Sequence, residues 1–129
     1  MAMNFNSNSV FNLTPISLSE MRPEISKLFL AGEKPVLAFR TIRDQLIFTN
    51  KRIISVDVQG VTGKRKSYTS MPYSKIQFHS IQTPGLLELV PDSELDLAFA
   101  NGVEAHFEFK GNVDIIMLDQ LIFSKELEG

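Results

Sequence analysis

Apolar and polar residues alternate along most of the chain from Val36 onward. Apolar residues at every second position are typical of half-buried β-strands, and Gly, Pro and Asn between such stretches mark their ends. We therefore expect an all-β domain whose strands follow one another as an antiparallel meander. The alternation predicts seven strands, over 36–43, 45–49, 52–58, 67–73, 75–83, 94–100 and 104–110.

The last two of these strands have the clearest alternation. They are joined by Asn101-Gly102, a strong signal for a hairpin turn. Residues two apart lie on the same face of a strand, so the apolar residues of this hairpin belong to one face. We expect that inward set to consist of Leu95, Leu97, Phe99, Ala105, Phe107 and Phe109.

The strand over 75–83 carries one of the two histidines. Period two places Ile76 and Phe78 on the inward face and Gln77 and His79 on the outward face. We therefore expect Phe78 in the core and His79 in contact with solvent.

The residues before the first strand lack this alternation. Asn and Ser dominate the first fifteen residues, which predicts a flexible arm. Helical signals follow: Ser17 and Glu20 have the spacing of a capping box, Pro23 suits a first helical turn, and Gly32 suits a C-terminal cap. The chain is thus divided into an arm, a helical segment and a β-rich domain, over 1–15, 16–33 and 34–129.

The chain closes with a helical pattern from about Val113 to Glu126, with Asn112 as the expected N-cap. Its apolar residues surround most of the helix instead of forming one stripe. One side of such a helix can close the end of a β-barrel, and the other sides need a second cover. We therefore expect a homo-oligomer whose interface includes Ile115, Leu118, Ile122 and Phe123.

The composition is that of one ordinary globular domain. With 129 residues and 43% hydrophobic content, the chain is long enough to bury a core without a disulfide or a metal. It contains no cysteine, which excludes disulfides and thiolate metal sites and fits a reducing compartment. The N-terminal residues lack the pattern of a signal peptide, and no apolar stretch approaches ~20 residues. We therefore expect a cytoplasmic protein, which can also be peripheral to a membrane.

Charge is distributed unevenly along the chain, although the net charge is only −2. Residues 34–85 contain nine Lys or Arg and two Asp or Glu, whereas residues 86–129 contain two and ten. If sequence position carries over into space, the protein has a positive and a negative side. Unlike faces of identical subunits can then meet head to tail, and such contacts close into rings when the rotation permits.

Several short motifs lie in and between the predicted strands. They are Gly32-Glu33, Arg43-Asp44, Phe48-Thr49-Asn50-Lys51-Arg52-Ile53-Ile54, Asp57 with Gln59-Gly60, Thr62-Gly63-Lys64, Pro72-Tyr73 and Lys75-Ile76. Seven antiparallel strands followed by a C-terminal helix form the architecture of pleckstrin-homology (PH) domains, and with these motifs the chain resembles the small single-domain bacterial PH proteins of unknown function. The resemblance covers about Leu28 to Leu127 and weakens after Gly85. It implies a seven-stranded antiparallel PH-like barrel, assembly into homo-oligomeric rings and no established activity.

A cluster of three cations, Lys64, Arg65 and Lys66, follows the third predicted strand. PH-like folds can bind phosphoinositides through basic residues between their first two strands, but here that turn is only Arg43-Asp44 and is too short to hold a headgroup. Three explanations of the cluster remain: a solvated loop, an anionic lipid surface, or the acidic face of a protein. Nucleic acid is not expected, because the chain is acidic overall and its cations are not interleaved with aromatic residues.

No residues form a recognisable catalytic or cofactor-binding motif, so neither catalytic residues nor a cofactor is predicted. Glu104, His106 and Glu108 share an outward face that can hold a metal ion weakly, but chance proximity on a surface is the commoner explanation, and no metal site is predicted. The sequence thus favours a non-enzymatic, homo-oligomeric binding or assembly module. The alternative is a peripheral membrane adaptor that binds anionic lipid through the basic cluster.

Overall fold

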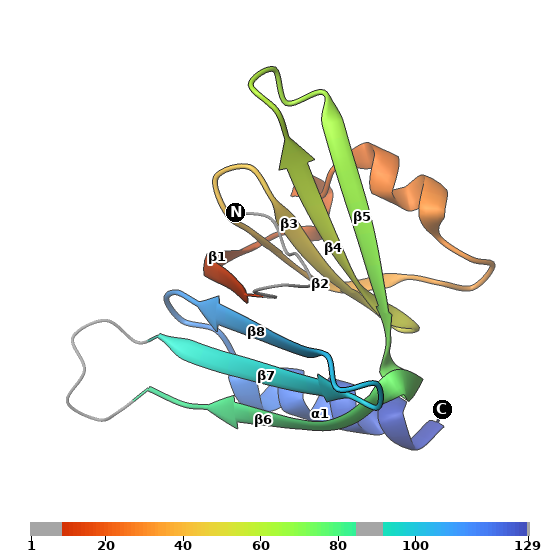
Figure 1. Cartoon of the computed structure of the whole chain (residues 1–129), viewed down its shortest axis with the longest axis vertical. Coiled ribbons are helices and arrows are strands. Elements are labelled where there is room, and N and C mark those ends of the chain that lie inside the picture. The colour runs from red at the N-terminus through yellow and green to blue at the C-terminus, as the bar shows by residue number, and fades with distance from the viewer. Residues whose placement is uncertain (1–8, 85–91, 129) are drawn as a thin grey trace.

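Eight strands form one strongly bent sheet in the order β5-β4-β3-β2-β1-β8-β7-β6 (Figure 1). The computed structural model describes residues 9–84 and 92–128 of the chain. The strands are β1 Ser9–Ile16, β2 Pro35–Arg40, β3 Gln45–Thr49, β4 Arg52–Gln59, β5 Arg65–Pro72, β6 Ile76–Gln82, β7 Ser93–Phe99 and β8 Glu104–Phe109. Three 3-10 turns and one α-helix complete the fold: η1 Leu18–Glu20, η2 Pro23–Leu28, η3 Tyr73–Lys75 and α1 Ile115–Glu128.

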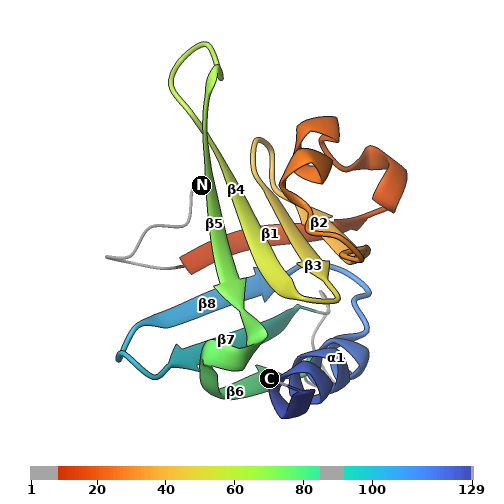
Figure 2. The ribbon, with the colours of Figure 1, turned by 90° about the vertical axis from the view of Figure 1, so that its right-hand side faces the viewer.

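Seven of the eight strands are those that the sequence predicts, and β2–β5 and β6–β8 each form an antiparallel meander. The prediction of seven antiparallel strands is nevertheless wrong in number and direction. Residues 9–16, most of which were expected in a flexible arm, form β1, which pairs antiparallel with β2 and parallel with β8. Through β1 the two meanders join into one mixed sheet, as Figure 2 shows from the side. Residues 1–8 of the expected arm lie outside the described residues.

An irregularity inside β1 explains why its apolar residues do not alternate. The register with β8 shifts between Val10 and Leu13, and Asn12 has a φ of 63°, in the left-handed region. Val10 and Leu13 are both buried as a result, at a spacing of three instead of two. A bulge of this kind hides a strand from a search for period two.

The segment between β1 and β2 contains two short 3-10 turns where an N-terminal helix was expected. The capping box does form, with the Ser17 amide donating to Oε1 of Glu20 at 3.1 Å. Pro23 begins η2, and Gly32, with a φ of 79°, lies in the loop after that turn instead of capping a helix. Ile25 is fully buried, so η2 covers the outer face of the first meander.

Two apolar cores lie on opposite faces of that meander. The smaller core packs Ile25 against Ala38, Ile47, Ile54 and Val56. The larger core fills the space enclosed by the bent sheet and α1, and its main members are Phe39, Leu46, Phe48, Ile53, Leu95, Leu97, Phe107, Phe109, Ile115, Leu118 and Ile122. The inward set predicted for β7 and β8 is confirmed, because five of its members are buried and the sixth is half-buried against the core.

β6 departs from the predicted register after its first residue. Its pairing with β7 shifts between Ile76 and Phe78, which reverses the faces of the residues that follow. Phe78 is 63% exposed, whereas the side chain of His79 is only 8% exposed. The prediction that Phe78 points inward and His79 outward is therefore wrong.

α1 begins at Ile115, slightly later than the sequence predicts. The Met117 amide donates to Oδ1 of Asp114 at 3.0 Å, so Asp114 caps the helix in place of Asn112. The helix lies against β6, β7 and η3. No helix within the described part of the chain has the length and the apolar character needed to cross a membrane.

Candidate functional site

The motif residues around Glu33 form a buried polar network. The fully buried carboxylate of Glu33 accepts hydrogen bonds from Nε of Arg52 at 3.0 Å, from Oγ1 of Thr49 at 2.7 Å and from the Leu30 amide at 2.9 Å. The Tyr73 hydroxyl donates to the carbonyl of Thr49 at 2.7 Å. Burial opposes ionisation of Glu33, but the hydrogen bonds outweigh it and hold the pKa of Glu33 below its usual range. Because these groups already bond to one another, the network stabilises the fold and leaves no group free for a ligand.

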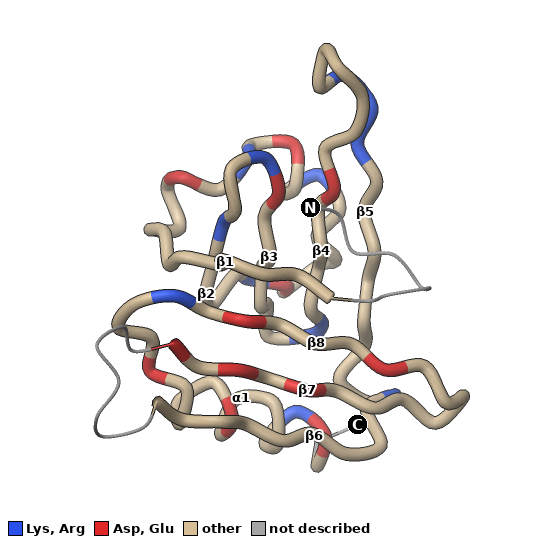
Figure 3. The backbone as a smooth tube through the Cα atoms, turned by 60° about the vertical axis from the view of Figure 1, so that its left-hand side comes forward, with Lys and Arg blue, Asp and Glu red and all other residues tan. Residues whose placement is uncertain are grey.

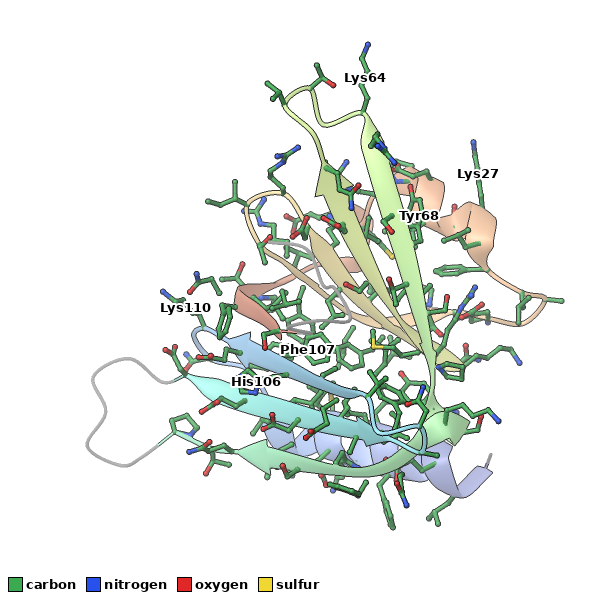
Figure 4. The ribbon with its side chains drawn as sticks, in the orientation of Figure 1. Lys27, Lys64, Tyr68, His106, Phe107 and Lys110 are labelled. Atoms are coloured by element: carbon green, nitrogen blue, oxygen red, sulfur yellow. The ribbon has the colours of Figure 1, made fainter. Side chains whose placement is uncertain are left out.

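The predicted basic cluster lies at the far end of the β4–β5 hairpin, which projects from the body of the molecule (Figures 1 and 4). Lys64 belongs to the turn, and Arg65 and Lys66 begin β5. Nζ of Lys66 lies 3.5 Å from Oε1 of Glu24 on η2. Lys64 and Arg65 are exposed and pair with no carboxylate among the described residues. The structure therefore leaves two of the three predicted cations available to a partner.

The turn between β2 and β3 is tied to this hairpin. Nη2 of Arg43 donates to the carbonyl of Gly60 at 2.6 Å. Ile42 and Val61, one on each turn, are fully exposed. We call the group of exposed residues at this end the basic tip: Ile42, Arg43, Val61, Lys64 and Arg65.

Two acidic residues next to the basic tip are buried and form hydrogen bonds inside the fold. Asp44 and Asp57 are both buried. Asp44 accepts a hydrogen bond from the Val58 amide at 3.0 Å, and Asp57 accepts one from the Gln59 side chain at 2.7 Å. These hydrogen bonds stabilise the β4–β5 hairpin and connect it to the turn between β2 and β3.

Acidic residues are concentrated along β7 and β8 (Figure 3). Glu94 lies directly opposite Glu108, Asp96 opposite His106, and Ala98 opposite Glu104. We call Glu94, Asp96, Glu104 and Glu108 the acidic face. The segregation of charge along the sequence therefore carries over into space, with the basic tip and the acidic face on different parts of the sheet.

His106 stands in the middle of the acidic face. Its Nδ1 lies 2.6 Å from Oδ1 of Asp96, and its Nε2 lies 3.2 Å from Oε1 of Glu94 and 3.2 Å from Oε2 of Glu108. Partial burial disfavours the charged imidazolium, but the hydrogen bonds and negative charges of Asp96 and Glu108 outweigh burial and raise the pKa of His106. Glu104, which the sequence grouped with His106, is not among its hydrogen-bond partners.

The sequence assigns Glu94 and Asp96 to an acidic face but does not place them beside His106, because they come from the other strand. A signal for them was present, however. The inward residues of both strands have odd sequence numbers. Because residues that pair directly across a hairpin lie on the same face of the sheet, odd-numbered residues must pair with odd-numbered ones and even-numbered residues with even-numbered ones. That parity requires a three-residue loop instead of a two-residue one, and the loop ends with Gly102 at a φ of 87°.

The second histidine links the sheet to the C-terminal helix. Nε2 of His79 lies 2.8 Å from Oδ1 of Asp119, and its Nδ1 lies 2.7 Å from Oε1 of Glu126. Both ring nitrogens are therefore already engaged by α1. This nearly buried arrangement is a structural contact that fixes the helix against β6.

The four residues predicted at an oligomer interface divide into two groups. Ile115, Leu118 and Ile122 are buried in the larger core and are not surface residues of the monomer. Phe123 is 52% exposed, and the nearby apolar surface of α1 comes from Ile116 and Leu127, which the sequence did not single out. Any contact of a partner with this helix therefore involves its outer side.

The structure also contains a groove of about 300 Å³ between the edge strand β5 and the β7–β8 loop. Its walls are mainly apolar and include Met71, Pro72, Phe99 and Val103. Among the described residues that line it, Lys75 is the one charged residue, and none is a carboxylate or a histidine. The groove therefore offers no pair of groups for acid–base chemistry.

Comparison with known sequences agrees with this architecture. Residues 4–125 match a family described as the bacterial PH domain. The uncharacterized protein YjqA of Bacillus subtilis (strain 168) is 39% identical over 95 residues, which are 74% of each chain. The uncharacterized protein YozO of the same organism is 30% identical over 112 residues, 87% of this chain and 94% of YozO.

Solved structures show the same fold. A protein with a pleckstrin-homology domain from Shewanella loihica PV-4 superimposes with a TM-score of 0.75 at 34% identity, over 91% of this chain and 99% of the other. A pleckstrin-homology domain from Shewanella amazonensis SB2B gives a TM-score of 0.63 at 32% identity, over 86% and 89%. Neither description names a ligand, so the fold is matched without an assigned activity.

Proposed function

The chain belongs to the bacterial PH domain family, and from this premise we propose that it acts as a non-enzymatic, homo-oligomeric binding module of the cytoplasm. The observation that carries the proposal is the separation of the basic tip from the acidic face. The fold of the relatives is generally non-catalytic, and no carboxylate or histidine among the described residues lines the groove between β5 and the β7–β8 loop.

The two charged regions complement each other between copies of the chain. Lys64 and Arg65 project from the end of a hairpin and have no carboxylate partner among the described residues. The acidic face presents four carboxylates, and within the described residues its only ion-pair partner is His106. A basic tip placed on the acidic face of the next copy is a heterologous contact, which leaves both regions free at the two ends and closes into a ring if the rotation permits.

Charge alone favours encounter more than tight binding, so a stable assembly also needs apolar area. The outer side of α1 supplies it through Ile116, Phe123 and Leu127, which are between 52% and 72% exposed. These residues replace the buried members of the predicted interface.

Light scattering on the purified full-length protein tests the proposal. At micromolar concentration and moderate salt we expect a mass larger than that of a dimer. Replacing Lys64, Arg65 and Lys66 by Gln should lower the mass, whereas replacing the exposed Lys27, Lys34 and Lys51 by Gln removes the same charge elsewhere and should not. A monomeric wild-type protein would overturn the proposal.

One observation favours a second function, a peripheral membrane adaptor that binds anionic lipid through the basic tip. Ile42 and Val61 are fully exposed at the ends of two neighbouring turns, beside Arg43, Lys64 and Arg65. Apolar residues at such positions can enter the interface of a bilayer while the adjacent cations pair with its headgroups.

A further inference from the structure

Three side chains on the outer face of β7 and β8 bring atoms that can bind a metal ion close together. They belong to Glu94, His106 and Glu108, and one possible ligand atom of each residue lies within 4.8 Å of those of the other two. Oε1 of Glu94 and Oε2 of Glu108 each lie 3.2 Å from Nε2 of His106. We propose that these three residues form a binding site for a single Zn²⁺ ion.

The separation of the ligand atoms fits the coordination geometry of zinc. Bonds of about 2.0–2.2 Å from Zn²⁺ to nitrogen and oxygen, at tetrahedral angles, place neighbouring ligand atoms roughly 3.3 to 3.5 Å apart. The two distances of 3.2 Å around Nε2 are close to that value. Ca²⁺ and Mg²⁺ prefer six or more oxygen ligands, so a set of one nitrogen and two oxygens favours zinc over these two ions.

Asp96 completes the arrangement from behind the histidine. Its Oδ1 lies 2.6 Å from Nδ1 of His106 and accepts the proton of that nitrogen. The imidazole then presents the lone pair of Nε2 to the point between Glu94 and Glu108. A carboxylate that orients a metal-binding histidine in this way is a regular feature of zinc sites. Asp96 is thus a positioning residue and not a ligand.

The negative charges around the site also favour a bound cation. Glu94 and Glu108 are direct cross-strand partners, and like charges directly opposite each other destabilise a sheet. Within the described residues, neither Lys nor Arg pairs with Glu94, Asp96 or Glu108. A divalent ion between the two glutamates turns this repulsion into shared coordination.

The site is built on rigid elements and keeps one position open. All its residues belong to the paired strands β7 and β8, so their backbones hold the ligands in place without a partner. Three protein ligands leave the fourth tetrahedral position to water or to a donor atom of a bound molecule. The proposal does not depend on homo-oligomerisation.

Calorimetric titration of the full-length protein, without a histidine tag, with ZnCl₂ tests the site. Measurements at about 0.3 M NaCl, where the Debye length is roughly 5 to 6 Å, limit charge-driven assembly. We expect one Zn²⁺ per chain. His106→Asn and Glu94→Gln should each weaken binding by at least about tenfold, and Asp96→Asn by about 10–100-fold.

Two matched variants separate a built site from general attraction to negative charge. Glu104→Gln removes a carboxylate from the same strand and face, and His79→Asn removes the other histidine; neither should change the affinity. Co²⁺ in place of Zn²⁺ should give the intense visible absorption of a tetrahedral site, and His106→Asn should abolish it. Absence of saturable binding, binding that survives His106→Asn, or equal losses in Glu94→Gln and Glu104→Gln would overturn the proposal.

Discussion

Phe107 and Phe78 show how the register of a strand decides the energetic role of a residue. Phe107 is fully buried and Phe78 is 63% exposed, as Figure 4 illustrates for the inward side chain of Phe107. Phe107→Ala should lower the free energy of unfolding by about 3–5 kcal/mol, because it leaves a cavity in the larger core. Phe78→Ala should change it by no more than about 0.5 kcal/mol. Urea unfolding of both variants checks the pair, and equal losses would contradict the bulge in β6.

Single residues also mark where sequence reasoning fails. The alternation in β7 and β8 is uninterrupted, so the burial of Phe107 could be predicted directly. Phe78 and His79 follow a register shift in β6, so strict alternation assigns them to the wrong faces. Asn12 lies at the register shift in β1, where strict alternation predicts no strand at all. A bulge depends on the partner strand, and no local pattern encodes the partner.

At the scale of elements, strands and the C-terminal helix were predictable because burial on one face imposes a period on the sequence. The structure of the segment over 16–33 was not predictable, because Pro23 and a capping box are compatible with both an α-helix and short 3-10 turns.

The motifs behind the family resemblance have a structural explanation. Glu33, Thr49 and Arg52 form the buried network that ties the loop before β2 to the β3–β4 turn.

That network predicts a specific dependence of stability on pH. The pKa of Glu33 is lower in the folded protein than its ordinary value of 4.5, so the stability that Glu33 contributes is complete above the unfolded value and is lost as pH falls through the folded value. Glu33→Gln should therefore cost about 2–3 kcal/mol near neutral pH and less under acid conditions. Urea melts between about pH 6 and pH 3 measure this difference. Curves that stay parallel to the wild type would contradict the assignment, and Glu104→Gln is the exposed control.

At the scale of the whole molecule, the charge pattern of the sequence survives folding because each half of the chain forms its own meander. The basic residues of the first half and the acidic residues of the second thus stay on separate parts of the sheet, as Figure 3 shows. The contacting pairs themselves were not predicted, although the parity of the β7–β8 hairpin carried a signal for the partners of His106. Lys66 pairs with Glu24, and His106 with Glu94 and Asp96, through contacts between segments that are separate along the chain.

A fluorescent probe in the basic tip distinguishes a membrane from a protein partner. The chain contains no tryptophan, so Val61→Trp introduces a single fluorescent probe at a fully exposed position. If the tip enters a bilayer, its emission should shift to the blue with vesicles that contain about 30% phosphatidylglycerol and not with pure phosphatidylcholine. Phe123→Trp, on α1 at the opposite end of the molecule, is the matched control and should not shift.

The same vesicles measure the electrostatic part of that binding. Replacing Lys64, Arg65 and Lys66 by Gln should weaken it by up to about 3 kcal/mol at low salt, at about 1 kcal/mol per cation. Unfolding should remain nearly unchanged, because exposed charges contribute little to stability. A Val61→Trp spectrum that does not respond to anionic vesicles, or the same shift in Phe123→Trp, would exclude insertion of the tip. If the triple variant instead dissociates an oligomer, the acidic face of the next copy is the partner of the tip, since the same three cations would then hold the assembly together.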